Sequence, residues 1–332
     1  MHCGFLSRSC RYFRNPSWLL LFLFISSSAI DFTPPGPKQR FAAIGPTAGL
    51  PAALRAALDT CEDFPPIPAP TCMDWLADYQ EDGQTYQQWL DAKPNMPDSI
   101  RNVIYLLPLC DMANANGPPL DKLGEFAGAF FAMKVKILPV LVLSDKDVFR
   151  RRDAHNKSGQ LLATDVLALM KKKLPADAFA MLGITMEDMY PGPGWNFVFG
   201  LASFNDRVGT YSFARYDPAF YGEEPGKARD KIMLKRSCKI LAHEGLHIFG
   251  LAHCIFFHCV ENGCNHIGEF DTTPLQLCPV DLRKLQRSVG FDVMKYYKRL
   301  GEVYEDLGFT KEAAWEKKRL MRVSASVFRK SN

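Results

Sequence analysis

The chain has 332 residues, of which 47% are hydrophobic and 23% are charged. This composition excludes disordered, collagen-like and coiled-coil proteins, and the length fits one large or two modest domains. The net charge of +4 is too small to indicate a nucleic-acid partner, so none is expected. Ten cysteines are too few for a disulfide scaffold, but their placement is uneven. Four cysteines lie between residues 254 and 278, and five of the seven histidines lie between residues 243 and 266. We expect the chemistry of the protein there.

The first 30 residues have the pattern of a secretory signal peptide. Arginines precede the apolar run at residues 18–25, and small residues follow it. The run is shorter than the roughly 20 residues that a membrane-spanning helix needs. We therefore expect a cleaved signal and a secreted or endoplasmic-reticulum location; a short anchor, an organellar presequence and an aberrant start are the alternatives. No second long apolar run follows, so no membrane contact is expected beyond this segment.

Residues 31–100 form a proline-rich extension. Nine of the 23 prolines lie between residues 34 and 70, a density that disfavours regular helices and sheets. We therefore predict extended segments packed on the surface, with one helical turn at residues 52–57. The aromatic rings within residues 71–90 are interpreted as docking the extension on the core rather than as a binding surface.

From residue 101 the pattern predicts an α/β protein in which strands alternate with helices. Apolar runs predict strands, apolar residues at helical spacing predict helices, and two aromatic runs around a short polar turn predict an antiparallel hairpin. The predicted strands are 103–109 and a buried 134–143, the helices are 121–133 and 164–174, and the hairpin strands are 195–203 and 208–215. After residue 285 we predict two more helices, with Lys317, Lys318 and Arg319 on a solvated face.

The most informative stretch is the helix predicted over residues 228–250. His243 and His247 are four residues apart, about 40° around the helix axis, so both imidazoles can reach one ion. A third ligand six positions further on would point away if the helix continued. Gly250 can take the left-handed conformation that ends a helix, which lets His253 return to the metal.

This spacing predicts a catalytic zinc site and the hydrolysis of peptide bonds. Three nitrogen ligands leave a tetrahedral Zn²⁺ with one open position for water. Zinc lowers the pKa of that water to about 7, and Glu244 would take its proton and pass it to the leaving amine. The alternative is a histidine-rich helix end that binds no metal. We expect a zinc metallopeptidase whose partner is a peptide or small protein substrate.

The string HEGLHIFGLAH at residues 243–253 is the metzincin zinc motif, and the cysteine directly after it makes the chain resemble the archaemetzincins. Further similar stretches are ITMEDMYP, WNFVFGLAS, VGTYSFARYDP and LRKLQRSVGF, so the resemblance spans most of residues 100–300. It implies a metzincin-like α/β fold, with a twisted mixed sheet, an antiparallel edge strand, packed helices and a small C-terminal helical subdomain. We expect a catalytic subdomain at residues 101–253 and a C-terminal subdomain at residues 254–332. We also expect a monomer, and the resemblance suggests a cytoplasmic location as the alternative to secretion.

The resemblance also implies a second, structural zinc. Cys254 and Cys259 match the Cys-x4-Cys pair of the family, and Cys278 opens its second knuckle. The last cysteine of the family is replaced by Asp281, whose carboxylate is a harder zinc ligand than a thiolate. Two alternatives stay open. The cysteines could form disulfides in a secreted protein, and the fourth ligand could instead be Cys264, His258 or His266.

Glu261 stands where the family has a methionine that forms the floor beneath the catalytic metal. A carboxylate at this position brings negative charge near the zinc and removes the apolar floor. We therefore expect looser ligand positions and low activity. Together with Asp281, this departure motivates the alternative function, a zinc-binding interaction module with little or no turnover.

The resemblance further implies that the strand at residues 195–203 is an antiparallel edge strand above the zinc. The free edge of a strand offers N–H and C=O groups to an extended peptide. We therefore predict substrate binding by Phe197, Val198, Phe199 and Gly200. Both faces of this run are apolar, which leaves a fully buried central strand as the alternative.

Overall fold

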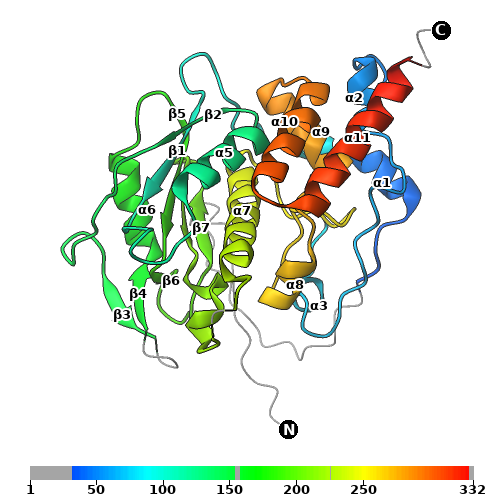
Figure 1. Ribbon diagram of the computed structural model, residues 1–332. Helices are drawn as coiled ribbons and strands as arrows, with labels where there is room; N and C mark the ends of the chain where they lie inside the picture. Colours follow the sequence, from blue (N-terminus) through cyan, green and yellow to red (C-terminus); the bar gives the residue numbers. More distant parts are fainter. Residues whose placement is uncertain (1–31, 154–157, 225, 329–332) are drawn as a thin grey trace.

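The computed structural model describes residues 32–153, 158–224 and 226–328, so the signal-like segment lies outside the described residues (Figure 1). The main sheet has five strands in the order β2-β1-β5-β8-β7, and only β7 runs antiparallel to its neighbour. The bounds of these strands are Lys134–Ile137 (β2), Val103–Pro108 (β1), Ala178–Thr185 (β5), Val208–Ser212 (β8) and Gly200–Ser203 (β7). A second sheet consists of β3 (Arg150–Arg152), β4 (Gly159–Leu162) and β6 (Asp188–Tyr190).

Helices cover both faces of the main sheet. They are α5 (Leu120–Phe130), α6 (Ala163–Lys172) and α7 (Arg229–Ile248). Alternate residues of β1 belong to different apolar clusters: Ile104 packs in the cluster that contains α5 and α7, whereas Leu107 packs in the cluster that contains α6. A strand that is buried on both faces has a continuous run of apolar residues, and this run is why the sequence predicted a strand at residues 103–109. The mixed α/β fold expected from the sequence is confirmed.

The strand predicted at residues 134–143 is shorter and more exposed than expected. Only residues 134–137 form β2, which lies at one edge of the sheet, and none of its four residues is buried. Pro139 follows and cannot donate a hydrogen bond to a neighbouring strand. The prediction of a long buried strand was therefore wrong, because the apolar run continues into a loop rather than into the sheet.

The proline-rich extension contains more helix than the sequence suggested. The predicted turn at residues 52–57 is confirmed as helix α2 (Ala52–Ala57), but residues 37–44 also form a helix, α1 (Pro37–Ile44). Pro37 occupies the first helical position, where a missing N–H costs nothing and the fixed φ favours the helix. Two short helices follow, α3 (Trp75–Asp78) and α4 (Tyr86–Asp91). The docking role of the aromatic rings is confirmed by the burial of Trp75, Tyr86 and Trp89.

The extension packs against the C-terminal helices, so segments from both ends of the described chain lie side by side (Figure 1). These helices are α8 (Ile267–Thr272), α9 (Pro279–Val289), α10 (Val293–Asp306) and α11 (Thr310–Phe328). Helix α1 packs on α9, and α2 packs on α11. The two helices predicted after residue 285 are confirmed as α10 and α11. No helix in the described ranges is long and apolar enough to cross a membrane.

The prediction that Arg319 lies on a solvated face was wrong. This side chain is fully buried on α11. Its guanidinium donates to the carboxylate of Asp63 at 3.0 Å and to the carbonyl of Ala57 at 3.0 Å. The sequence run around Arg319 is cationic, and nothing local in it indicates that an acidic residue more than 250 positions away covers one member.

Candidate active site

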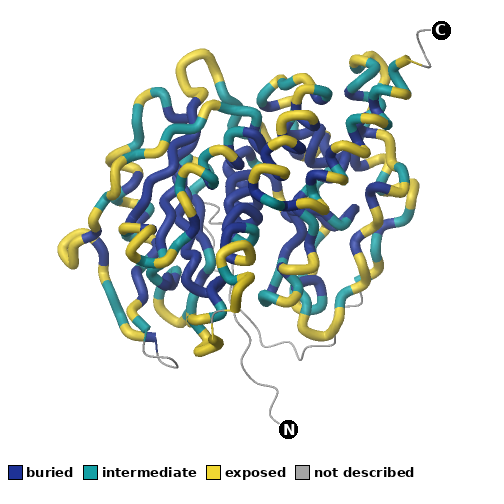
Figure 2. The backbone as a smooth tube through the Cα atoms, viewed as in Figure 1, coloured by how far each residue is buried: buried dark blue, intermediate teal, exposed yellow. Residues whose placement is uncertain are grey.

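Helix α7 carries the first two histidines into the middle of the molecule, where the tube is buried along most of its length (Figure 2). His243 and His247 lie on one side of its last two turns, and their Nε2 atoms are 3.1 Å apart. The helix ends at Ile248, and Gly250 takes the predicted left-handed conformation with a φ of 80°. The chain then turns so that the ring centroid of His253 lies 5.2 Å from the ring centroids of the other two histidines. The predicted return of the third histidine is confirmed.

The other nitrogen of each ring is held by a hydrogen-bond acceptor. The Nδ1 atom of His243 lies 2.9 Å from the carbonyl of Val260, and the Nδ1 atom of His247 lies 2.7 Å from the carbonyl of Leu251. The Nδ1 atom of His253 lies 2.8 Å from the carboxylate of Glu81. Each ring therefore carries its proton on Nδ1 and presents an unprotonated Nε2 to the centre of the cluster.

This arrangement fits a zinc ion. Two Nε2 lone pairs that face each other at 3.1 Å cannot share a hydrogen bond, but both can bind one cation. Zinc–nitrogen bonds of about 2.0–2.1 Å at a tetrahedral angle place two nitrogens about 3.3 Å apart, close to the distance found here. The ligand atoms of all three histidines lie within 4.8 Å of one another.

The protonation of His243 and His247 also suits metal binding. Burial lowers the pKa of His243 to about 3 and lowers the pKa of His247 well below its usual range, so both rings are neutral near pH 7. Burial acts on His253 as well, but the Glu81 carboxylate beside it raises the pKa of His253 above its usual value. The pKa of the third ligand is thus raised by the carboxylate that contacts its Nδ1 atom.

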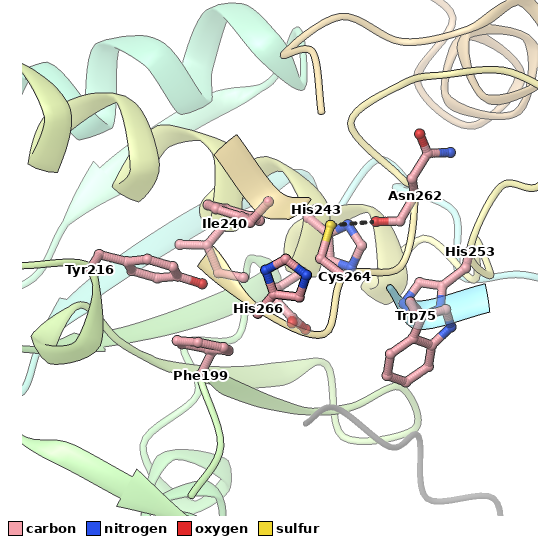
Figure 3. A pocket seen from close by; sticks show the side chains of 11 residues that line it. Trp75, Phe199, Tyr216, Ile240, His243, His253, Asn262, Cys264 and His266 are labelled. Atoms are coloured by element: carbon pink, nitrogen blue, oxygen red, sulfur yellow. Dashed lines mark hydrogen bonds between the residues drawn. The ribbon is translucent and has the colours of Figure 1, made fainter. Parts of the chain in front are cut away.

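A cavity lies beside the three histidines. His243, His253 and Glu244 line it, and Glu244 itself is almost fully buried. Most of the remaining wall is aromatic or apolar; Figure 3 shows Phe199 and Tyr216 on one side and Trp75 beside His253 on the other. The residues that complete the lining are Ile240, Asn262, Cys264, His266 and Phe270.

A second cluster of metal-ligating side chains lies directly behind the third histidine. It consists of Cys254, Cys259, Cys278 and Asp281, all buried and with their ligand atoms within 4.8 Å of one another. The Sγ atoms of Cys254 and Cys278 are 3.7 Å apart, and a carboxylate oxygen of Asp281 lies 3.1 Å from Cys278 Sγ. Zinc–sulfur bonds of about 2.3 Å at a tetrahedral angle place two sulfurs about 3.8 Å apart. The donor set and its spacing therefore fit a structural zinc.

The open alternatives for this cluster can now be decided. The eight cysteines in the described ranges are all free, and a sulfur–sulfur distance of 3.7 Å is far longer than a disulfide bond of about 2.05 Å. Asp281 completes the cluster because it lies three residues after Cys278 on the first turn of α9, which brings both side chains to one side. The other fourth-ligand candidates lie elsewhere: Cys264 and His266 line the cavity beside the histidines, and His258 lines a separate pocket next to the extension. The ammonium of buried Lys284 lies 3.2 Å from Asp281 and offsets part of the negative charge.

Glu261 lies beneath the histidine cluster, as its position in the sequence suggested. It is fully buried, with one carboxylate oxygen 3.0 Å from Nδ1 of His247 and the other 3.8 Å from Nδ1 of His243. Each of these Nδ1 atoms has a closer carbonyl acceptor, and neither carboxylate oxygen of Glu261 has a hydrogen-bond partner among the described residues. Burial, with Asp281 nearby, raises the pKa of Glu261 well above its usual range. The buried carboxyl group of Glu261 is therefore less stable at this position than an apolar side chain of similar size would be.

Replacing Glu261 by methionine should raise both the stability and the turnover of the protein. Leaving a buried polar group without a partner costs about 1–3 kcal/mol, so Glu261→Met should raise the free energy of unfolding by a similar amount. Firmer support of His247 should also raise turnover, by less than the ~100-fold that a misplacement of about 1 Å costs. Urea unfolding and peptide turnover measure the two effects, with exposed Glu302→Met as the control variant. Turnover that is unchanged or lower in Glu261→Met would contradict the floor argument.

The four residues predicted to bind substrate occupy different surroundings. Strand β7 is the outer strand of the main sheet and is antiparallel to β8, which confirms an edge strand rather than a central one. The strand begins only at Gly200, where an added Cβ would lie 3.3 Å from the carboxyl carbon of Glu244. Phe199 lines the cavity, whereas Val198 is buried in the cluster around α6. The ring of Phe197 stacks under the guanidinium of Arg215 at 3.7 Å.

Sequence reasoning missed the contribution of the extension to this site. Glu81 contacts His253 and Trp75 lines the cavity, although both lie more than 170 positions before His253. The aromatic content of residues 71–90 signalled that the extension docks, but not where. Nothing in the sequence distinguishes Glu81 from the acidic residues around it.

Three imidazoles from a helix and its return loop, with a glutamate beside a cavity under an edge strand, define a zinc metallopeptidase site of the metzincin type. Comparison with known proteins agrees, since residues 130–287 match the model of peptidase family M54. The chain is 37% identical over 272 residues to Archaemetzincin-2 from Homo sapiens, and the match covers 73% of this chain and 75% of that protein. It is 36% identical over 271 residues to Archaemetzincin-2 from Macaca fascicularis, with the same coverage.

A solved structure shows a likeness as well. The crystal structure of an archaemetzincin from Methanopyrus kandleri has 25% sequence identity and a TM-score of 0.44, over 58% of this chain and 97% of that one. On the curated relatives and the family model, the chain belongs to the archaemetzincin family, peptidase family M54. It is a zinc metallopeptidase, with one zinc site at the three histidines and a second at the Cys3–Asp cluster, and its substrates are peptides.

Proposed function

We propose that the chain hydrolyses peptide bonds with Glu244 as the general base and general acid. The observation that carries this proposal is the position of Glu244, which is buried on the zinc helix and lines the cavity together with His243 and His253. Zinc, when bound, polarises a peptide carbonyl and lowers the pKa of water. Glu244 takes the proton of the attacking water and delivers it to the leaving amine, as a carboxylate within reach of both can do.

We also propose that the substrate lies in an extended form along β7. The outer edge of this strand faces no other strand of the main sheet, and Gly200 brings its backbone close to Glu244. Phe199 and Gly200 are the predicted substrate residues that border the cavity or Glu244, so they should contact the residues next to the cleaved bond. The aromatic lining favours an apolar side chain there, because the wall offers few polar groups.

The proposed unit of activity is a monomer in which residues 101–253 form the catalytic subdomain and residues 254–332 the zinc-stabilised one. The proposed substrates are modest-sized peptides. The alternative is a zinc-binding module without turnover, favoured by the unpartnered carboxylate of Glu261 beneath the ligands.

One experiment distinguishes the two functions. Metal content is measured by mass spectrometry, and turnover of a peptide library is measured with and without a chelator. Hydrolysis that stops with chelator and returns with zinc supports the enzyme. A protein that holds zinc in both sites and cleaves no member of the library supports the binding module.

A further inference from the structure

The last turn of the zinc helix is held by side chains from the N-terminal extension. The last carbonyl groups of a helix have no partner within it and need one from elsewhere. The carbonyl of Ile248 accepts from Asn95 Nδ2 at 3.1 Å, and the carbonyl of Phe249 accepts from Trp89 Nε1 at 2.9 Å. We call the four residues Glu81, Gln84, Trp89 and Asn95 the clasp.

The clasp also grips the loop that leads to the third zinc ligand. Gln84 donates from Nε2 to the carbonyl of Gly250 at 3.1 Å and accepts from the N–H of Ala252 at 3.2 Å. One side chain thus spans the two residues on either side of Leu251. The backbone between the end of α7 and His253 is fixed from outside the motif.

Glu81 completes the clasp at the ligand itself. Its carboxylate lies 2.8 Å from Nδ1 of His253, and its side chain is only 23% exposed. His243 and His247 project from a helix, and the nearest acceptor of each Nδ1 atom is a backbone carbonyl. His253 lies on a loop, and the nearest acceptor of its Nδ1 atom is the carboxylate of Glu81. A carboxylate partner fixes the tautomer and orientation of a ligating imidazole and makes it a stronger base.

We propose that the clasp sets the zinc affinity of the catalytic site, with Glu81 as the positioning residue of His253. The extension is then a working part of the metal site and not only a covering of the core. This inference rests on the zinc site of the three histidines and not on the role proposed for Glu244, so zinc affinity tests it even if the protein has no turnover.

The test compares zinc binding by full-length Glu81→Ala and by the wild type. Chelator competition gives the affinity, and cobalt substitution separates the two sites because only the cysteine site shows thiolate-to-cobalt charge transfer. Affinity at the histidine site should fall about 10–100-fold, the usual cost of losing such a partner, while affinity at the cysteine site stays unchanged. Asp82→Asn removes the exposed neighbouring charge and should leave both affinities as in the wild type.

Two further variants keep the result clear. Glu81→Gln has the shape of glutamate and retains an acceptor, so it should fold like the wild type and lose part of the affinity. Gln84→Ala should also weaken the histidine site, and exposed Gln87→Ala serves as its control. Wild-type affinity at the histidine site in Glu81→Ala, or in Glu81→Gln if the alanine variant does not fold, would overturn the proposal. The proposal would also be overturned if the only change in the Glu81 variants were a lower Tm of the zinc-free protein.

Discussion

Glu244→Gln should retain about two zinc ions per chain and lose at least ~100-fold in peptide turnover, the usual scale for removing an acid–base group. The side chain lies beside the histidines without belonging to the cluster that fits the metal, so glutamine can replace it without removing a ligand. Metal analysis and single-peptide kinetics measure the two quantities on the same sample.

The control for this variant is Asp82→Asn, an exposed acidic residue that should change neither quantity. Equal turnover in Glu244→Gln and the wild type would contradict the role of Glu244. Absence of turnover in both, with zinc present in both, would favour the zinc-binding module.

The double variant Cys259→Ser Cys278→Ser should reduce the zinc content from about two ions per chain to one. Structural zinc contributes folding free energy directly, and even ~5 kcal/mol lost would lower Tm by roughly 7 °C in a chain of this size. Turnover should fall too, because Cys254 is the neighbour of His253 and its N–H donates to the carbonyl of Glu261 at 2.8 Å. Metal analysis and thermal unfolding monitor the loss.

Cys72→Ser Cys110→Ser is the matched control, since neither cysteine belongs to the cluster. It should keep two zinc ions and a Tm close to that of the wild type. An intact protein with one zinc ion, and cysteines that react with an alkylating agent only after reduction, would instead support a disulfide in place of the second zinc.

The parts of the site that were predictable depend on short sequence distances. His243 and His247 share a helix face because of the four-residue spacing, and the left-handed Gly250 returns His253 to them. Local spacing fixes the histidine group before any tertiary contact is known. The second cluster was predicted from the family resemblance instead, because spacing alone did not choose between Asp281 and the other candidates for its fourth ligand.

The parts that escaped prediction depend on contacts between distant segments. Glu81 meets His253 across 172 positions, and Arg319 meets Asp63 across 256. A single sequence contains no pairing information over such separations. The exposure of β2 was missed for a related reason, since an apolar run does not reveal whether a strand lies inside a sheet or at its edge.

The packing of α2 on α11 has a consequence for the synthesis of the protein. A ribosome releases the extension first and α11 last, so Arg319 reaches Asp63 only after nearly all of the described chain has emerged. Until then α2 lacks one of the helices on which it packs. Among the described residues, all three cations that pair with the buried carboxylate of Asp63 lie on α11, namely Lys318, Arg319 and Arg322. A chain that stops short of α11 therefore leaves this carboxylate without those partners, so the last helix to be synthesised is the one that secures the extension.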